Sequence, residues 1–586
     1  MDKRMIFVVF ALSLLSSGFG DNFFPIGAYH VDTTRMCQVD SAGFNTVQGL
    51  VKTGFEQVYV DSAAAHSLKA IVEHYSQSTQ RNLWTYTHIQ HVVYESDTDH
   101  GLLPFVHATG QSVYDPDATG GSTAWWCAEE AHDSGVMQYA GWSVFENQPG
   151  LYQYEDDLQY TASFRLKMAN PNSSDIFPLC SLYVDKRHGW PPNVDTFIHL
   201  ADTIVRFNSF VQPHSYDYFE LKFNRDKADT GFHYQYGAYW YGRDTIWLDH
   251  VRLKDQRWDS LTFHRAYDQD LEAVVGSYVN NQALFRWYLA DEPWWNVFGS
   301  NRYVTNFLRD FGAQAGAAPV CAMDRLGAYV DSVNPEHVWV NMYPLMGGGY
   351  EGGRTPEDTG RAFQAQLDNA LCAKLGVARG VAKSAGIPLW FTPQAFGDSI
   401  PGETLPGYKW EKTWREPTPR ELSCMVWLGL AYGAKGIIYY HYPVSWERDH
   451  WVLGLVNRDG SPRGPKWAVV CSLNADLSRV ASVLLGVSSD TVFRSDDIPE
   501  SSWINAVSDP LVQIGLFHDA EGGQYSIMVN RHCGVHDTLL VTVGTTSVEK
   551  QHSLKDMLTG EEYTTKVGTF RPIQLLPGGG RLFKLR

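Results

Sequence analysis

The sequence has 586 residues, which is too many for a single hydrophobic core, so several domains are expected. Its formal net charge of −18 argues against nucleic acid or an anionic membrane as a partner, because binding to phosphate requires clustered Lys and Arg. Aromatic residues make up 14% of the chain, and 20 of them are Trp, which suits flat surfaces that stack on sugars as well as large cores.

The first 20 residues have the order of a secretory signal peptide. Lys3 and Arg4 precede an apolar run over residues 5–15 that is too short to span a bilayer. Gly18 and Gly20 then supply the small residues expected before a cleavage site. No later stretch reaches 18 uninterrupted apolar residues. We therefore expect a secreted or periplasmic protein without a membrane span; the pattern does not indicate an oligomeric state.

Short apolar runs alternate with helical patterns in two parts of the chain, residues 21–91 and 256–486. Strand, helix and strand in succession indicate parallel α/β structure. The expected strands number eight, the strand number of a (β/α)8 barrel. They cover residues 24–29, 44–47, 68–74, 284–289, 319–323, 337–341, 388–392 and 436–440. A doubly wound sheet is the alternative, but it usually shows a glycine fingerprint after its first strand, and the sequence has none.

Two further parts of the chain show short alternating runs, turn-rich clusters and almost no helical period. Residues 92–255 fit an antiparallel β-sandwich, inserted after the third barrel strand on the face where such barrels carry their sites. Residues 487–586 fit a second, smaller β-sandwich. The predicted fold class is therefore α/β: a (β/α)8 TIM barrel with an inserted β-sandwich and a C-terminal β-sandwich.

Eight cysteines are scattered along the chain, and none forms a C-x-x-C pair. Cys127 and Cys180 fall in one expected domain and are a candidate disulfide, although sequence alone does not determine the pairing. No G-x-S-x-G elbow, phosphate-binding loop or H-E-x-x-H motif occurs, and the histidines are not at metal-ligand spacing. We expect no metal and no cofactor.

The fourth expected strand runs into residues 290–293, Ala-Asp-Glu-Pro. A carboxyl group at the carboxyl end of a barrel strand points into the mouth of the barrel. Aromatic residues, Trp294 among them, bracket Asp291 and Glu292. An apolar surround disfavours the ionised form of a carboxyl group, which suits a general acid. We predict Glu292 as the catalytic acid; the alternative is an exposed acidic turn that begins the next helix.

This arrangement resembles the clan A glycoside hydrolases, whose barrels carry an acid/base Glu after strand 4 in an Asn-Glu-Pro or Asp-Glu-Pro context. Looser agreement extends to residues 24–27 and 42–47 at strands 1 and 2, and to residues 417–437 before and in strand 8. Residues 94–249 resemble galactose-binding-like carbohydrate modules. The resemblance implies a secreted glycosidase that cleaves an oligo- or polysaccharide, with Glu292 as its general acid.

The resemblance fails at strand 7, where retaining clan A enzymes place their nucleophilic Glu. Gln394 stands at that position, and an amide cannot attack an anomeric carbon to form the usual ester. Strand 6 offers Asn341, again an amide. Glycoside hydrolysis ordinarily needs two carboxyl groups, so the second must come from elsewhere. Four candidates remain, the first two ranked together above the others: Asp324 after strand 5, Glu73 after strand 3, Asp291 and Glu447.

A base on strand 3 or strand 5 is more easily placed with water between it and the sugar, which favours inversion through Asp324 or Glu73. Further strand-end residues are candidates to bind the substrate, with packing as the alternative for each: His30, Asp291, Trp294, Tyr343, Gln394, Tyr440 and His441. Two alternatives to a hydrolase stay open. One is a non-catalytic secreted glycan-binding protein on a decayed barrel, and the other is a polysaccharide lyase or transglycosylase.

Overall fold

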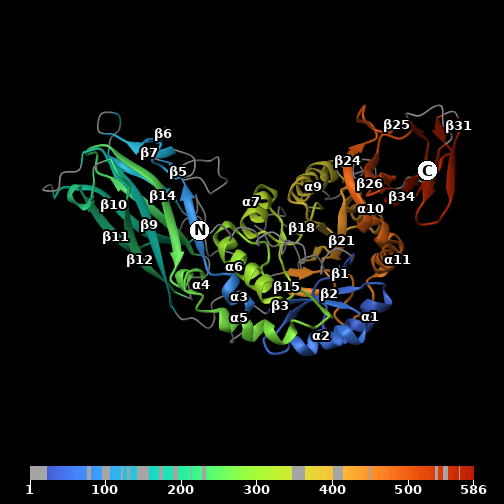
Figure 1. The fold of residues 1–586 in the computed structure, drawn as a ribbon, viewed down its shortest axis with the longest axis horizontal. Coiled ribbons are helices and arrows are strands. Elements are labelled where there is room, and N and C mark those ends of the chain that lie inside the picture. The colour runs from blue at the N-terminus through green and yellow to red at the C-terminus, as the bar shows by residue number, and fades with distance from the viewer. Residues whose placement is uncertain are drawn as a thin grey trace, which may run out of the picture. The chain divides into compact units, whose positions relative to one another are not determined.

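The chain forms two compact units, which are described separately. Figure 1 labels their helices and strands. The first comprises Met1–Gln48, Ser62–Lys69 and Glu336–Arg586, and the second comprises Gly49–Asp61 and Ala70–Pro335. The computed structural model describes residues 23–74, 81–95, 106–107, 109–119, 123–128, 131, 134–140, 157–170, 176–188, 196–212, 214–226, 232–345, 363–399, 414–447, 450–534, 539–545, 552–566 and 568–586. The expected signal peptide lies outside these residues, so export stays a prediction.

Parallel strands form the core of the first unit. They are β1 (Ile26–Ala28), β2 (Thr46–Val51, which begins in this unit), β18 (Val338–Met342), β19 (Leu389–Pro393) and β21 (Ala434–Tyr439). Gly27 of β1 lies opposite Thr46 of β2 and Ile438 of β21, and β19 pairs with both β18 and β21. Nearly every residue of these strands is buried, as expected for a parallel sheet covered on both faces.

Helices accompany these strands in the order that the helical patterns predict. They are α1 (Met36–Ser41), α9 (Ala373–Ala385), α10 (Pro419–Ala431) and α11 (Gly464–Gly486). At the start of α10, the Thr418 side chain accepts from the Glu421 N–H and the Glu421 carboxylate accepts from the Thr418 N–H at 2.8 Å. This capping box fixes where the helix before β21 begins. A small antiparallel sheet adds β20 (Asp398–Ser399), β22 (Ser445–Glu447) and β23 (His450–Val452).

The second unit has its own group of parallel strands. They are β3 (Lys69–His74), β15 (Leu284–Tyr288), β16 (Gly316–Ala317) and β17 (Pro319–Val320). Glu73 of β3 lies opposite Tyr288 of β15, and Trp287 lies opposite Gly316 of β16. The helices are α2 (Glu56–Ala65), α3 (Leu83–Thr87), α4 (Trp258–Thr262), α5 (Asp268–Val275), α6 (Trp295–Phe311) and α7 (Met323–Val333).

The order of the parallel strands is that of a barrel. It reads β16-β15-β3-β2-β1-β21-β19-β18-β17. Only Ala318 separates β16 from β17 in the sequence, so the two ends of this order belong to one stretch of chain, the predicted fifth strand. Counted that way, the described residues contain the eight expected strands in the expected succession. The sheet is therefore barrel-like, which confirms the α/β prediction and excludes a doubly wound order.

Two antiparallel sheets form from residues 91–255 of the second unit. One has the order β12 (Asp217–Asp226), β9 (Asp157–Met168), β14 (Ile246–Asp255), β7 (Thr123–Cys127), β6 (Gln111–Tyr114), with β4 (His91–Glu95) also on β14. The other has the order β11 (Thr196–Arg206), β10 (Pro178–His188), β13 (Phe232–Trp240), β8 (Gly135–Ala140), β5 (Val106–His107). The ring of Phe223 in β12 lies 5.8 Å from the rings of Tyr234 and Tyr236 in β13, so aromatic side chains join the two sheets.

Residues 91–255, expressed alone, are expected to give a soluble domain that unfolds cooperatively. All strands of both antiparallel sheets come from this range, and apolar side chains such as Phe164, Trp240 and Leu253 are fully buried. Urea denaturation followed by circular dichroism and tryptophan fluorescence should give coincident, single transitions. An unfolded product would mean that residues of the barrel complete this core.

A C-terminal antiparallel sheet belongs to the first unit and begins at Val487. Its order is β24 (Val487–Arg494), β26 (Val512–Asp519), β27 (Gln524–Asn530), β34 (Gly580–Leu585), β30 (Ser553–Asp556), β31 (Glu562–Lys566), β32 (Thr569–Phe570), β29 (Val543–Thr545), β25 (Ile504–Val507). A separate pair is β28 (Leu539–Val541) with β33 (Ile573–Leu575). Ile514, Met528 and Phe583 are completely buried in its core.

One helix of the described part of the chain, α11, is long and apolar enough to cross a membrane by length and composition alone. Its side chains Val470, Leu473 and Leu477 are buried. The Asn474 amide donates to the Ala42 carbonyl at 3.0 Å. These contacts place one face of α11 in the core of the first unit, and the absence of a membrane span stays a prediction.

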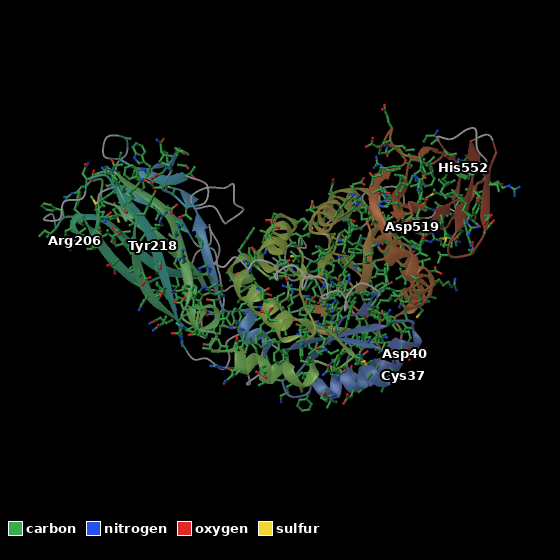
Figure 2. All side chains as sticks on the ribbon, viewed as in Figure 1. Cys37, Asp40, Arg206, Tyr218, Asp519 and His552 are labelled. Atoms are coloured by element: carbon green, nitrogen blue, oxygen red, sulfur yellow. The ribbon has the colours of Figure 1, made fainter. Side chains whose placement is uncertain are left out.

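The cysteines at all eight positions, every one of them in the described ranges, are free thiols. Cys127 in β7 and Cys180 in β10 lie in different sheets, and burial raises the pKa of both thiols. Both thiols are free, so the candidate disulfide between them is not formed in this structure. Cys37 in α1 is exposed (Figure 2).

Candidate active site

Glu292 lies four residues beyond β15 and adopts an unusual backbone conformation. Its φ is +48°, in the left-handed region that non-glycine residues rarely occupy. Its N–H donates to the Pro319 carbonyl at 3.1 Å, which ties the end of β15 to the start of β17. The side chain is half-buried. Backbone strain of this kind is found where the surrounding structure holds a functional side chain in place.

The Cys321 thiol interacts with the Glu292 carboxylate, and the Arg325 guanidinium acts on the same thiol. The Cys321 thiol donates a hydrogen bond to that carboxylate, and burial, followed by the negative charge of Glu292, raises the pKa of the thiol. The positive charge of Arg325 acts on the same thiol in the opposite direction. Arg325 is 8% exposed, and its guanidinium lies 3.6 Å from the centre of the Trp294 ring. Trp294 itself is 43% exposed, so it is not the buried aromatic neighbour that the sequence predicted.

Asp291 is held differently from its neighbour. Its carboxylate accepts a hydrogen bond from the Tyr288 hydroxyl at 2.6 Å, although the residue is exposed. Tyr288 is buried and its ring stacks parallel to that of Trp84, whose indole N–H donates to the Tyr288 carbonyl at 3.1 Å. The tyrosine is thus fixed by α3 and in turn fixes Asp291. The Asp291 carboxylate is thus tied to Tyr288, whereas Glu292 bonds the Cys321 thiol.

Glu73 is a buried carboxyl group at the carboxyl end of β3. The next residue, His74, stacks on Trp287 and bonds Glu56 at the start of α2 at 2.9 Å. Burial raises the pKa of Glu56, but the hydrogen bond and charge of His74, together with bonds from backbone N–H groups, outweigh this and leave the pKa lowered. Successive side chains of a strand point to opposite faces, so Glu73 points away from α2. Its register partner in β15 is Tyr288, whose hydroxyl bonds Asp291.

Asp324 lies in the first turn of α7, and its side chain is 82% exposed. Its Oδ1 lies 4.0 Å from Nε of Arg325. The helical period explains the exposure: Leu326, Val330 and Val333 form the buried stripe of α7, and Asp324 lies on the opposite side. The same pattern turns Arg325 inward. The sequence analysis did not identify Cys321 and Arg325 as site residues. Their positions just after the fifth strand, together with the buried stripe of α7, are the signals that could have identified them. Glu447 closes β22 in the first unit.

His30 and His441 make a direct contact in the first unit. His30 follows β1 with φ +58°, and its N–H donates to the Gln48 side chain at 2.9 Å. Its Nδ1 lies 2.6 Å from Nε2 of His441, and the two rings are perpendicular with centroids 4.7 Å apart. His441 follows β21 and is completely buried. The sequence proposed both as strand-end candidates without indicating that they touch.

Aromatic rings gather beside this histidine pair. Tyr440 lies 6.0 Å from His30 and 5.6 Å from Tyr343, measured between ring centroids. Phe396 lies 4.9 Å from Tyr343, and Trp414 lies 5.7 Å from Phe396. Tyr343, Tyr440 and Trp414 are half-buried, so part of each ring faces solvent. The carboxyl ends of β1, β18, β19 and β21 thus carry an aromatic surface of the type that stacks on sugars.

Gln394, at the position of the missing nucleophile, is completely buried. Its carbonyl oxygen accepts from the Leu345 N–H at 2.8 Å, and its amide nitrogen donates to the Arg415 carbonyl at 2.9 Å. The side chain therefore tethers the segments after β18 and β19 to each other. Its polar groups are bonded to the backbone, and its place among the substrate-binding residues stays a prediction.

Buried His88 is expected to make stability fall in acid. It lies after α3 with its ring stacked on Trp84, and its Nδ1–H donates to the Trp84 carbonyl at 2.9 Å. Burial lowers its pKa from 6.5 to about 4. As the pH falls, the unfolded chain takes up this proton before the folded one does. The contribution of neutral His88 to the free energy of unfolding is therefore complete above pH 6.5, and about 3 kcal/mol of it is lost as the pH falls to 4. Urea denaturation at pH 7 and pH 4.5 should show a smaller loss for His88→Gln; equal losses would contradict the assignment.

Comparisons with known proteins found similarity to solved structures. No protein-family model matches the sequence, and no curated protein matches it. A GH27 β-L-arabinopyranosidase from Geobacillus stearothermophilus is similar over 54% of this chain and 61% of its own, with 13% identity and a TM-score of 0.28. A rhamnosidase from a Novosphingobium species is similar over 97% and 83%, with 7% identity and a TM-score of 0.37. The C-terminal CBM6 module of a marine laminarinase from Zobellia galactanivorans is similar over 28% and 98%, with 12% identity and a TM-score of 0.18.

The chain thus spans less than two thirds of the length of the arabinopyranosidase. These structural neighbours are glycoside hydrolases and a carbohydrate-binding module. In the described residues, no group of three or more His, Cys, Asp or Glu is placed to hold a metal ion.

Proposed function

We propose that this protein is an exported glycoside hydrolase that cleaves an oligo- or polysaccharide, with Glu292 as its general acid. The observation that carries the proposal is the placement of Glu292 after a barrel strand, in a strained backbone conformation and hydrogen-bonded by the Cys321 thiol. A half-buried carboxyl group is open to a substrate and partly shielded from water. Such a group can protonate the leaving glycosidic oxygen, which is the role of the acid in glycoside hydrolysis.

The proposed base is a second carboxylate that activates water, which gives inversion of the anomeric configuration. Glu73 and Asp324 are the candidates. The burial of Glu73 and its position opposite Tyr288 favour Glu73, whereas Asp324 is largely surrounded by solvent. The amide of Gln394 supports this route over retention, because it leaves no nucleophile after β19 and is itself bonded to the backbone.

A second candidate function is glycan binding without catalysis. The observation that favours it is the same Gln394, whose burial makes the usual strand-7 site chemically inert. In that case the aromatic surface of Tyr343, Tyr440 and Trp414, or the antiparallel sheets of residues 91–255, would hold the glycan.

The experiment that separates the two functions uses the purified full-length protein. It is incubated with a panel of soluble polysaccharides and oligosaccharides, and new reducing ends are measured. Binding to the same panel is measured in parallel by affinity electrophoresis. New reducing ends from at least one glycan support the hydrolase; binding without any cleavage across pH 4–8 would replace it with the glycan-binding function.

A further inference from the structure

The protons of the His30–His441 pair can be placed from the hydrogen bonds. Nδ1 of His441 lies 2.5 Å from the Pro443 carbonyl oxygen, which only accepts, so Nδ1 carries a proton. A neutral His441 then has a lone pair on Nε2. Nε2 lies 2.6 Å from Nδ1 of His30, so the proton of this second hydrogen bond belongs to His30. In a neutral His30, Nε2 is left as the acceptor nitrogen.

The surroundings keep both rings neutral. Burial lowers the pKa of His30 to about 4, and burial together with the charge of His30 lowers the pKa of His441 well below its ordinary value. Lys466 adds a further positive charge that acts on His441 in the same direction. A cationic His441 would need to donate from both nitrogens and would reverse the hydrogen bond to His30. These factors oppose that form near neutral pH.

The acceptor nitrogen of His30 is set in place and open. Among the described residues, no hydrogen-bond partner of His30 Nε2 is found, and the residue is half-buried. The backbone of His30 has a left-handed conformation and is held by the hydrogen bond from its N–H to the side-chain oxygen of Gln48. The rings of Tyr29 and Tyr440 flank the imidazole at 6.1 and 6.0 Å. A ligand that stacks on the Tyr440 surface would therefore meet a fixed acceptor at its edge.

We propose that His30 Nε2 accepts a hydrogen bond from one hydroxyl group of a neutral sugar, and that His441 is a positioning residue that keeps His30 in this tautomer. The inference deepens the proposed function, on which it rests for the identity of the ligand as a sugar. The specificity then comes from a hydroxyl that donates to His30. A sugar that lacks this hydroxyl leaves the half-buried acceptor unpaired, which selects against binding of that sugar.

The first test reads the tautomer directly in the full-length protein. Histidine labelled with ¹⁵N is introduced, and the signals of His30 are assigned by their loss in His30→Asn. At pH 7 the His30 Nε2 signal is expected at the shift of an unprotonated ring nitrogen. It should move towards the protonated range when D-galactose, D-glucose, L-arabinose or L-rhamnose is added at high concentration and donates to it. A protonated Nε2, or no movement with any of the four sugars, would overturn the proposal.

The second test uses variants that keep or remove the acceptor. His30→Gln keeps an amide oxygen near the position of Nε2, whereas His30→Asn keeps only the donor towards His441. With the glycan cleaved best in the panel, His30→Asn should raise KM by about tenfold with kcat little changed, and His30→Gln should restore most of the loss. His441→Phe removes the acceptor that holds the proton on Nδ1 of His30, so it should raise KM as well. Equal KM values for all three variants and the wild type would overturn the inference.

The two proposals fail separately. If the wild type cleaves no glycan but the His30 Nε2 signal responds to a sugar, the hydrolase proposal falls and the sugar contact stands. If cleavage occurs and the His30 variants behave as wild type, the hydrolase stands and the contact falls.

Discussion

Glu292→Gln is expected to lower kcat by a factor of roughly 10²–10⁴, because the amide has no proton to give to the leaving oxygen. The substitution keeps the size of the side chain and the backbone bond from the Glu292 N–H to Pro319, so folding should be unchanged. The Cys321 thiol can still donate to the amide oxygen. The measurement is the initial rate of reducing-end formation at saturating glycan, with thermal unfolding followed in parallel.

The matched control is Glu272→Gln. Glu272 is an exposed acid on α5 of the same unit and has no role in the proposed chemistry. Its activity and its thermal unfolding should both equal those of the wild type. If Glu292→Gln keeps more than a tenth of the wild-type rate, Glu292 is not the general acid, and the search moves to Asp291 and Glu73.

Glu73→Gln and Asp324→Asn are expected to differ sharply. Loss of the buried carboxylate should lower kcat by a factor of roughly 10²–10⁴, because water is then no longer activated. Loss of the exposed one should change the rate by no more than about a factor of two to three, since exposed side chains away from special features contribute little. The rates of both variants are measured with the same glycan and compared with the wild type.

The stereochemistry of the wild-type reaction checks the same assignment independently. The anomeric proton of the first-formed product, followed by NMR, should show inversion if a carboxylate-activated water attacks the sugar. A product that keeps the configuration of the substrate would rule out water activation in the first step. In that event a carboxylate that attacks the sugar directly must exist, and equal, small effects of both variants would place it outside this pair.

The barrel strands could be predicted from the sequence because each is a short apolar run that is buried on both faces. The strand expected at residues 388–392 is observed at Leu389–Pro393, and the one expected at residues 68–74 is observed at Lys69–His74. Such runs carry their own signal, whatever the rest of the chain does. The position of Glu292 followed from the same signal, because a strand that is located also locates the residue that follows it.

The facing of side chains was harder to predict than their position. Asp324 was selected because it follows the fifth strand, but the apolar stripe of α7 turns it to the surface and turns Arg325 inward. Gln394 was selected for the same reason, and its amide proved to be bonded to the backbone of two other segments. These outcomes depend on contacts between segments that are distant in the sequence, which no local pattern contains.

The contact between His30 and His441 in the first unit can form only after most of the chain has been synthesised. His30 and His441 are 411 positions apart, and β1 has β21 as one of its two neighbours. At about 5–20 residues per second, a ribosome needs roughly 20–80 s to supply the later strand after the earlier one. All residues of the second unit lie at or before Pro335, so they are all synthesised before that interval ends. The apolar strand at the N-terminus must wait, and chains that stop short of Ala434 leave it without the partner that completes its hydrogen bonds.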